Sequence, residues 1–196
     1  MKNSEIRPGS YRKTQHPIET LILERWSPRA MSGEAVETGQ LMRLFQAARW
    51  APSPANGQPW FYLFTTRDRA DWPLFYGLLD AGNQEWCHKA WALVVVLAEA
   101  VRPNGRPNRL AGFSSGLSVQ NLLLQGHALG LVTHPMAGFY PEKVAETLGT
   151  PPEYDPQIMI AIGQPGEISE LSARNQAREY PSQRKALSEI VRKGGF

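Results

Sequence analysis

The chain has 196 residues, a formal net charge of +3 and 42% hydrophobic residues. This length predicts one domain that buries about 70% of the surface its unfolded chain exposes, and the small charge excess gives no reason to expect a nucleic-acid partner. The single cysteine, Cys87, excludes an internal disulfide and fits a reducing compartment. Neither a membrane-spanning apolar run nor a secretory signal is evident, so we expect a cytoplasmic protein.

Residues 1–16 are predicted to form an extended N-terminal arm, and residues 17–196 a single folded domain. A short amphipathic helix at the start of this domain is followed by Arg25, Ser27 and Arg29, two guanidiniums and a hydroxyl close together in sequence. These groups can converge on one anion, and each charge-assisted hydrogen bond would contribute about 1.5 to 3 kcal/mol. The alternative is solvated surface charge, the usual fate of arginine.

A second polar segment follows an amphipathic helix that is predicted over residues 41–48 from apolar side chains at helical spacing. Pro52 and Pro54 prevent this helix from continuing, and Asn56 and Gln58 come next, before an aromatic strand. Amide side chains donate and accept hydrogen bonds at once, which suits the edge of a planar heterocycle such as the pyrimidine end of a flavin. An ordinary connecting loop explains the same residues, so this segment alone does not decide between them.

The rest of the chain alternates between helical and strand patterns, which predicts a sheet flanked by helices. A valine-rich run over 92–97 predicts a strand buried on both faces, and residues 102–109 read as a polar loop. A long apolar stretch closed by Gly130 predicts a central buried helix. In chain order the predicted elements are strand 60–64, helix 71–79, strand 92–97, helix 114–129, strand 131–134, helix 141–148 and strand 157–162.

Two motifs make the chain resemble the nitroreductase family of FMN-dependent oxidoreductases. The first is Arg-x-Ser-x-Arg, met by Arg25, Ser27 and Arg29, and the second is a Pro-Ser-x-x-Asn-x-Gln-Pro-Trp segment. The second segment consists of Pro52, Ser53, Asn56, Gln58, Pro59 and Trp60. The resemblance covers residues 17–191 and implies an α+β, three-layer fold, with a mixed β-sheet flanked by helices around a long buried central helix. It also implies an intertwined homodimer with FMN at the subunit interface.

The resemblance further implies which residues bind the cofactor. Arg25, Ser27 and Arg184 would hold the FMN phosphate, although Lys185 fits the same C-terminal position. Asn56 and Gln58 would hold the pyrimidine edge, while Arg29 would stabilise negative charge near N1 and C2=O of the reduced ring. The full set of expected cofactor-binding residues is Arg25, Trp26, Ser27, Arg29, Pro52, Ser53, Asn56, Gln58, Pro135, Met136, Ala137, Gly138, Arg184 and Lys185.

One of these positions departs from the family pattern. Relatives often have glutamate where this chain has Ala137, in a segment whose backbone N–H lies against the flavin N5 in the family. Alanine keeps the N–H and loses the carboxylate. The loop over 99–112 is also short where other members carry extra helices.

The activity implied by the resemblance is a ping-pong reaction, in which NADH or NADPH delivers hydride to FMN and a nitroaromatic, quinone or related small acceptor is then reduced. The flavin carries this chemistry, so no metal is expected. An FMN-binding protein without redox turnover, serving flavin storage or regulation, is the alternative that Ala137 and the short loop leave open. A basic nucleic-acid binder ranks third.

The sequence gives little support for a serine hydrolase, a metal site or a phosphate-binding glycine loop. Residues 112–116 match the G-x-S-x-G of a nucleophile elbow, yet a polar loop precedes them and no Asp or Glu lies between Ser114 and the last histidine, His134. The four histidines, His16, His88, His127 and His134, lack metal-ligand spacing, and His134 is a candidate to face the flavin pocket. No phosphate-binding glycine motif is present.

Overall fold

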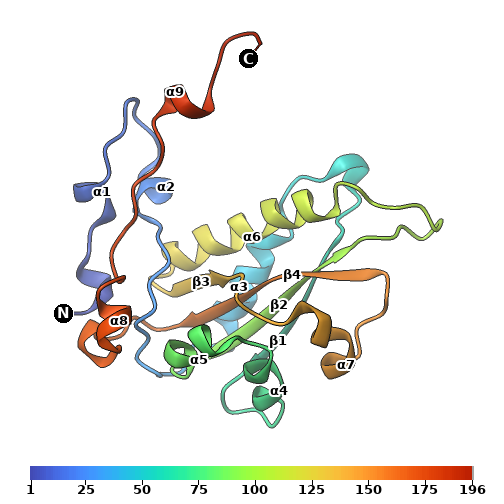
Figure 1. The fold of residues 1–196 in the computed structure, drawn as a ribbon, viewed down its shortest axis with the longest axis horizontal. Helices are drawn as coiled ribbons and strands as arrows, with labels where there is room; N and C mark the ends of the chain where they lie inside the picture. The colour runs from blue at the N-terminus through green and yellow to red at the C-terminus, as the bar shows by residue number, and fades with distance from the viewer. Residues whose placement is uncertain (196) are drawn as a thin grey trace.

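A four-stranded sheet forms the centre of the molecule in the computed structural model, which describes residues 1–195 (Figure 1). Its strands are β1 (Trp60–Thr66), β2 (Ala92–Glu99), β3 (Val132–Met136) and β4 (Tyr154–Gly163), in the order β1-β2-β4-β3. Strand β2 is buried along almost its whole length, as its valine-rich sequence predicts.

All strand pairs in this sheet are antiparallel. The expected mixed sheet is therefore wrong for the described residues. The physical reason lies in helix α6 (Ala111–Ala128), which connects β2 to β3. This crossover makes β3 run in the same direction as β2 but one strand position away, and β4 fills the space between them in the opposite direction.

Helices cover both faces of the sheet, as expected for three layers (Figure 1). Alternate residues of β2 point to opposite faces, so Val94 joins one hydrophobic core and Val95 the other. Helices α3 (Thr38–Ala48) and α6 pack on the Val94 face. The opposite face is covered by α4 (Trp72–Gly77), α5 (Ala81–Cys87) and α7 (Val144–Leu148).

Helix α6 is the expected long central helix, but it is buried on one side only. Leu122 and Leu123 lie in the core, whereas Phe113 is 67% exposed and a side chain at Gly116 would meet open space. The sheet and α3 can cover only one side of a helix at the edge of the molecule, so the other side remains uncovered in a single chain. Among residues 1–195 no helix is long and apolar enough to cross a membrane.

The two ends of the chain run side by side (Figure 1). The N-terminal arm is not simply extended, because it contains a 3₁₀ turn (Asn3–Glu5) and helix α1 (Pro8–Tyr11), before α2 (Thr20–Glu24). The C-terminal segment carries α8 (Ala173–Gln176) and α9 (Leu187–Ile190). The Gln183 amide donates to the Tyr11 carbonyl at 2.6 Å, which holds the two segments together.

Candidate functional site

Arg25 sits immediately after α2 and is half-buried against its own loop. Its Nη1 donates to the Trp26 carbonyl at 3.0 Å and to the Ser27 hydroxyl at 3.1 Å. Burial lowers the pKa of Arg25, and the positive charges of Arg12 and Arg184 lower it further. Three guanidiniums from three separate segments therefore repel one another here, as expected where an anion is to be bound.

Arg12 from the N-terminal arm is the member of this arginine cluster (Arg12, Arg25 and Arg184) that the sequence did not reveal. It donates to the Leu23 carbonyl, to the Arg25 carbonyl at 2.8 Å and, through Nε, to the Ser182 carbonyl at 3.3 Å. One side chain thus joins the arm, the end of α2 and the C-terminal segment. No motif spacing marks Arg12, because its partners are backbone carbonyls distant in sequence.

The two candidates for a C-terminal phosphate ligand differ in their surroundings. Arg184 donates to the Ser182 hydroxyl at 2.8 Å and contributes to the charge around Arg12 and Arg25. Lys185 is exposed and pairs with no residue of the range 1–195. The geometry therefore favours Arg184 over Lys185.

Arg29 faces the C-terminal segment, where Glu179 organises its surroundings. The Glu179 carboxylate accepts from the backbone N–H of Arg29 at 2.7 Å and of Ala30 at 2.9 Å, and its side chain has no exposed surface. The Arg29 guanidinium lies 3.8 Å from the same carboxylate and donates to the Arg178 carbonyl at 3.2 Å. Burial, followed by the charge of Arg178, lowers the pKa of Arg29, while Glu179 opposes that shift.

His134, in the middle of β3, connects the arginine loop (residues 25–29) to the sheet. Its Nδ1 lies 2.9 Å from the Pro28 carbonyl, which can only accept, so Nδ1 carries the hydrogen. The ring packs on Trp86 at a centroid distance of 4.6 Å. Burial lowers the pKa of His134 to about 4, which keeps the ring neutral near pH 7.

Gly138 lies just beyond β3, in the segment that departs from the family pattern. Its carbonyl accepts from the Asp80 N–H at 3.0 Å and from the Asn83 amide at 2.9 Å. A Cβ at Gly138 would lie 2.2 Å from an Asp80 carboxylate oxygen and 2.6 Å from the Asn83 amide, so a larger residue would have to displace these side chains. Trp86 donates to Asn83 at 3.2 Å, which completes a path of contacts from Gly138 through Asn83, Trp86 and His134 to the arginine loop.

The backbone of this segment also presents unused donors. Ala137 is exposed, whereas Met136 before it is buried in the core. Neither the Ala137 N–H nor the Gly138 N–H has an acceptor within residues 1–195. Pro135 and Met136 belong to β3 itself. Two free N–H groups next to each other can bind carbonyl oxygens or ring nitrogens of a ligand.

The loop over residues 52–58 is exposed and strained. Ala55, Asn56 and Gln58 have φ values of 52°, 53° and 44°, which cost non-glycine residues about 1 to 3 kcal/mol each when tertiary structure imposes them. Gln58 is held by its N–H to the Ser53 hydroxyl at 2.9 Å and by its amide to the Asn56 carbonyl at 3.1 Å. The Asn56 side-chain amide points to solvent, with no partner among the described residues.

These predicted residues form two groups at opposite ends of α6. Trp26 and Pro28 line a cavity of about 540 Å³ together with His127, near the C-terminal end of the helix, whereas residues 53–59 lie beside Ser114 at its N-terminal end. The helical rise places Ser114 and His127 about 20 Å apart. A single chain therefore joins the arginine loop, Arg184 and residues 134–138, but does not bring the 52–58 loop to them.

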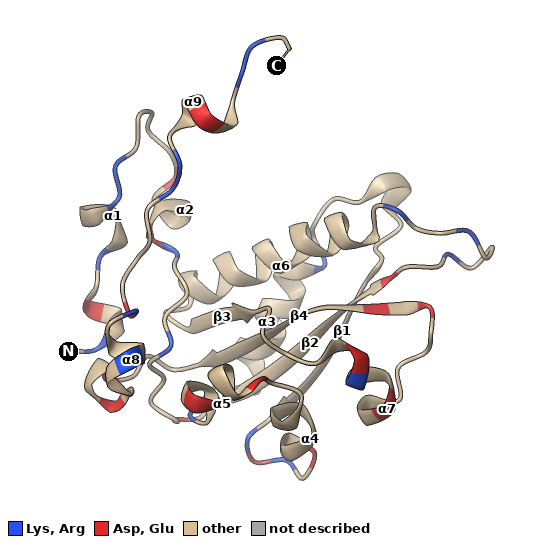
Figure 2. Cartoon of the chain, viewed as in Figure 1, with Lys and Arg blue, Asp and Glu red and all other residues tan. Residues whose placement is uncertain are grey.

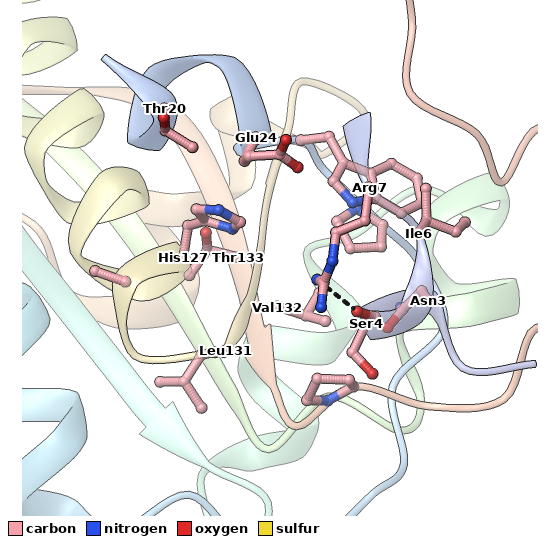
Figure 3. Close-up of a pocket in the computed structure, with 15 residues that line it drawn as sticks. Asn3, Ser4, Ile6, Arg7, Thr20, Glu24, His127, Leu131, Val132 and Thr133 are labelled. Atoms are coloured by element: carbon pink, nitrogen blue, oxygen red, sulfur yellow. Dashed lines mark hydrogen bonds between the residues drawn. The ribbon is translucent and has the colours of Figure 1, made fainter. Parts of the chain in front are cut away.

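The cavity at the C-terminal end of α6 is closed by the N-terminal arm. Figure 3 shows Arg7, Glu24 and His127 around it, and Arg7 donates to the Ser4 carbonyl at 3.2 Å. Glu24 accepts from the Gly9 N–H at 3.0 Å, which fixes the arm over α2. The arm is thus part of the wall behind the arginine loop.

The competing motif over 112–116 lies in the first turns of α6 and follows no strand. Ser114 is 1% exposed, and no histidine is hydrogen-bonded to it among the described residues. The nucleophile-elbow interpretation is therefore excluded. Within residues 1–195, no three His, Cys, Asp or Glu side chains are grouped to hold a metal.

Comparison with known proteins agrees with this architecture. A solved structure described as an oxidoreductase containing FMN is 34% identical, covers 94% of this chain and 96% of that chain, and superposes with a TM-score of 0.91. A protein named NADH dehydrogenase from Thermus thermophilus is 29% identical over 203 aligned positions, or 88% of this chain and 94% of the relative.

A third relative is described as an uncharacterized 15.4 kDa protein from Mycolicibacterium smegmatis. It is 33% identical over 118 residues, which cover 59% of this chain and 77% of the relative. The pattern of the Nitroreductase family matches residues 22–81 and 66–164, which together span most of the chain. With the three-layer fold and both motifs in place, the chain belongs to the Nitroreductase family.

Proposed function

We propose that this protein is an FMN-dependent oxidoreductase that takes reducing equivalents from NADH or NADPH and passes them, in a ping-pong reaction, to a small acceptor such as a nitroaromatic or a quinone. The observation that carries the proposal is the arginine cluster, together with the free N–H groups of Ala137 and Gly138. Contacts through Asn83, Trp86 and His134 link the segment of these N–H groups to the arginine loop. A phosphate and a heterocycle with polar edges match these two features. The FMN-containing relative at 34% identity supports this assignment.

The residues present fit FMN. Arg25, Arg184 and the Ser27 hydroxyl would bind its phosphate, with Arg12 adding charge. The Ala137 and Gly138 N–H groups would meet polar atoms of the ring. When bound, the flavin supplies the redox chemistry, accepting hydride from the nicotinamide and then reducing the acceptor.

The remaining residues orient the ring and set its electrostatic environment. Asn56 and Gln58 would bind the pyrimidine edge, supported by Pro52 and Ser53. Arg29 would place positive charge near that edge, because a guanidinium has five donors and Glu179 and Arg178 engage only part of it. Trp26 and Pro135 would supply apolar contact and exclude water, whereas the Met136 side chain lies in the hydrophobic core and would support this segment from behind.

A complete site requires a second copy of the chain, because the 52–58 loop lies at the far end of α6 from the arginine cluster. Across a two-fold axis the uncovered sides of two α6 helices can pack antiparallel, which brings the N-terminal end of one to the C-terminal end of the other. Apolar residues are exposed where such a dimer would bury them. They include Ile18, Leu21, Ile22, Phe113, Ile190 and Val191.

A visible absorption spectrum of the purified protein, with identification of the released chromophore and anaerobic titration with NADH and NADPH, tests the proposal. We expect a yellow protein that releases FMN and is bleached by at least one nucleotide. Bound FMN that both nucleotides leave oxidised would instead support an FMN-binding protein without turnover, an alternative that rests on Ala137 in place of glutamate. A protein that binds no FMN would contradict both.

A further inference from the structure

Residues 100–108, most of them within the predicted polar loop, fold back on themselves as a hairpin loop with one isolated bridge between Val101 and Pro107. Asn108 N–H donates to the Ala100 carbonyl at 2.7 Å, and Arg102 N–H to the Arg106 carbonyl at 2.9 Å. Gly105 closes the turn with a φ of +76°, a conformation that favours glycine. The hairpin projects from the body of the protein beside the N-terminal end of α6 (Figure 1).

A cavity of about 510 Å³ separates this hairpin from the 52–58 loop. Residues of the hairpin line one wall, and residues of the strained loop line the other. The cavity also reaches Ser114, which is 1% exposed and whose hydroxyl has no hydrogen-bond partner within residues 1–195. The polar lining is Glu99, Arg102, Asn104, Asn108 and Ser114.

The cavity lining carries one charge of each sign, those of Arg102 and Glu99. The sequence contains no Asp or Glu between Glu99 and Glu142, whereas the hairpin region carries Arg102, Arg106 and Arg109 (Figure 2). Of these arginines only Arg102 lines the cavity. Two further acids, Glu153 and Asp155, lie on the chain that pairs with the hairpin base, but Asp155 is engaged by the Gln157 amide at 2.8 Å.

This lining suits a ligand that carries both an anionic group and hydroxyls. A guanidinium fork pairs with phosphate oxygens, while a carboxylate accepts from sugar hydroxyls. We propose that the cavity holds the phosphate-bearing ribose portion of NADH or NADPH, with Arg102 pairing with the phosphate and Glu99 accepting from a ribose hydroxyl. The inference rests on the proposed function, and it assigns the electron donor to a place next to the loop that would hold the flavin edge.

The test compares two electron donors in variants of the FMN-loaded protein. The donors are NADPH or NADH and 1-benzyl-1,4-dihydronicotinamide, which has a nicotinamide ring but no phosphate. Arg102→Ala should raise KM for the nucleotide about 10-fold, the loss of one charge-assisted hydrogen bond, and leave KM for the phosphate-free donor unchanged. Arg106→Ala, on the same hairpin but outside the cavity, is the matched control and should behave as wild type.

Two results would overturn the inference. One is an unchanged nucleotide KM in Arg102→Ala; a raised KM for a carboxylated quinone in the same variant would then assign the cavity to the acceptor. The other is an equal rise of KM for both donors, which would mean that the hairpin supports the flavin. Failure of the proposed function is distinguishable, because wild-type protein would then be reduced by neither donor.

Discussion

The two groups of residues proposed to hold the cofactor are built in opposite ways. The arginine loop is braced from three directions: by Arg12 from the arm, by Glu179 from the C-terminal segment and by His134 from β3. The 52–58 loop is exposed, has three left-handed non-glycine residues and leaves the Asn56 amide unpaired among the described residues.

The chain thus fixes its own arginine loop through internal contacts, whereas the 52–58 loop exposes its binding groups to a second molecule. Like charges gathered in one place need a rigid frame, because they repel one another until an anion arrives. The exposed 52–58 loop leaves the Asn56 amide available to a group outside its own chain. Its backbone strain persists because the flanking prolines and Ser53 fix the loop.

The largest expected effect tests the brace at Glu179. Glu179→Ala should lower the free energy of unfolding by about 3 to 5 kcal/mol, because two backbone N–H groups and Arg29 lose a buried partner. Urea denaturation at fixed protein concentration measures it. Glu170→Ala is the control: its exposed pair with Lys89 should contribute less than about 1 kcal/mol. Equal losses in both variants would show that Glu179 is no brace.

The next effect concerns the anion site itself. Arg25→Ala should raise the Kd for FMN about 100-fold, the loss of two charge-assisted hydrogen bonds, as measured by quenching of flavin fluorescence. Arg184→Ala should raise it about 10-fold, since Arg184 is the more exposed ligand. Lys185→Ala is the matched neighbour and should bind FMN as wild type does. A larger loss in Lys185→Ala than in Arg184→Ala would reverse the assignment.

His134, which contacts the arginine loop, makes the free energy of unfolding depend on pH. Its pKa is about 4 in the folded protein against an ordinary value of 6.5, so the unfolded chain binds the proton more readily. Stability from the neutral ring is complete above pH 6.5 and is lost as pH falls toward 4, by about 2 kcal/mol at pH 5. Urea midpoints between pH 7 and pH 5 measure this slope.

His134→Gln, whose amide can still donate to the Pro28 carbonyl, should flatten the dependence. His127, whose pKa burial also lowers, accounts for part of any remaining slope. An unchanged slope in His134→Gln would mean that the ring is not buried in its neutral form.

The smallest expected effect comes from changing Asn56, which is also the most direct test of the 52–58 loop. Asn56→Ala should weaken FMN binding about 10-fold. If each site takes the arginine cluster from one chain and Asn56 from its partner, mixing Arg25→Ala with Asn56→Ala protein and allowing subunit exchange should restore about a quarter of the sites to wild-type affinity. Two sites built within single chains would show no restoration.

Much of the architecture follows from local sequence patterns. The eight-residue strand β2 begins at Ala92 as predicted, because a valine-rich run has few other stable environments. Helix α6 ends one residue before its predicted end, next to Gly130, whose φ of +72° suits a helix terminus. Helix α5 was missed, since its polar, glycine-containing sequence shows no apolar periodicity; Asp80 caps it instead by accepting from the Asn83 N–H at 2.8 Å.

The site was predictable where it consists of short motifs and not where it depends on distant contacts. Arg25, Ser27 and Asn56 carry recognisable spacing. Arg12 and Glu179 act through backbone groups more than ten residues away, and such pairs leave no periodic signal. The direction of β4 was equally hidden, because it is set by the space that the α6 crossover leaves in the sheet.

The length of α6 has a consequence for how the protein would keep its cofactor. With half of the binding groups at each end of this helix, a separated chain can offer only part of the affinity. Flavin retention then depends on protein concentration, because dilution favours dissociation of the dimer. Flavin binding favours association, by mass action. Added FMN should accordingly lower the concentration at which dimers form, so that the flavin acts as an assembly factor as well as a redox group.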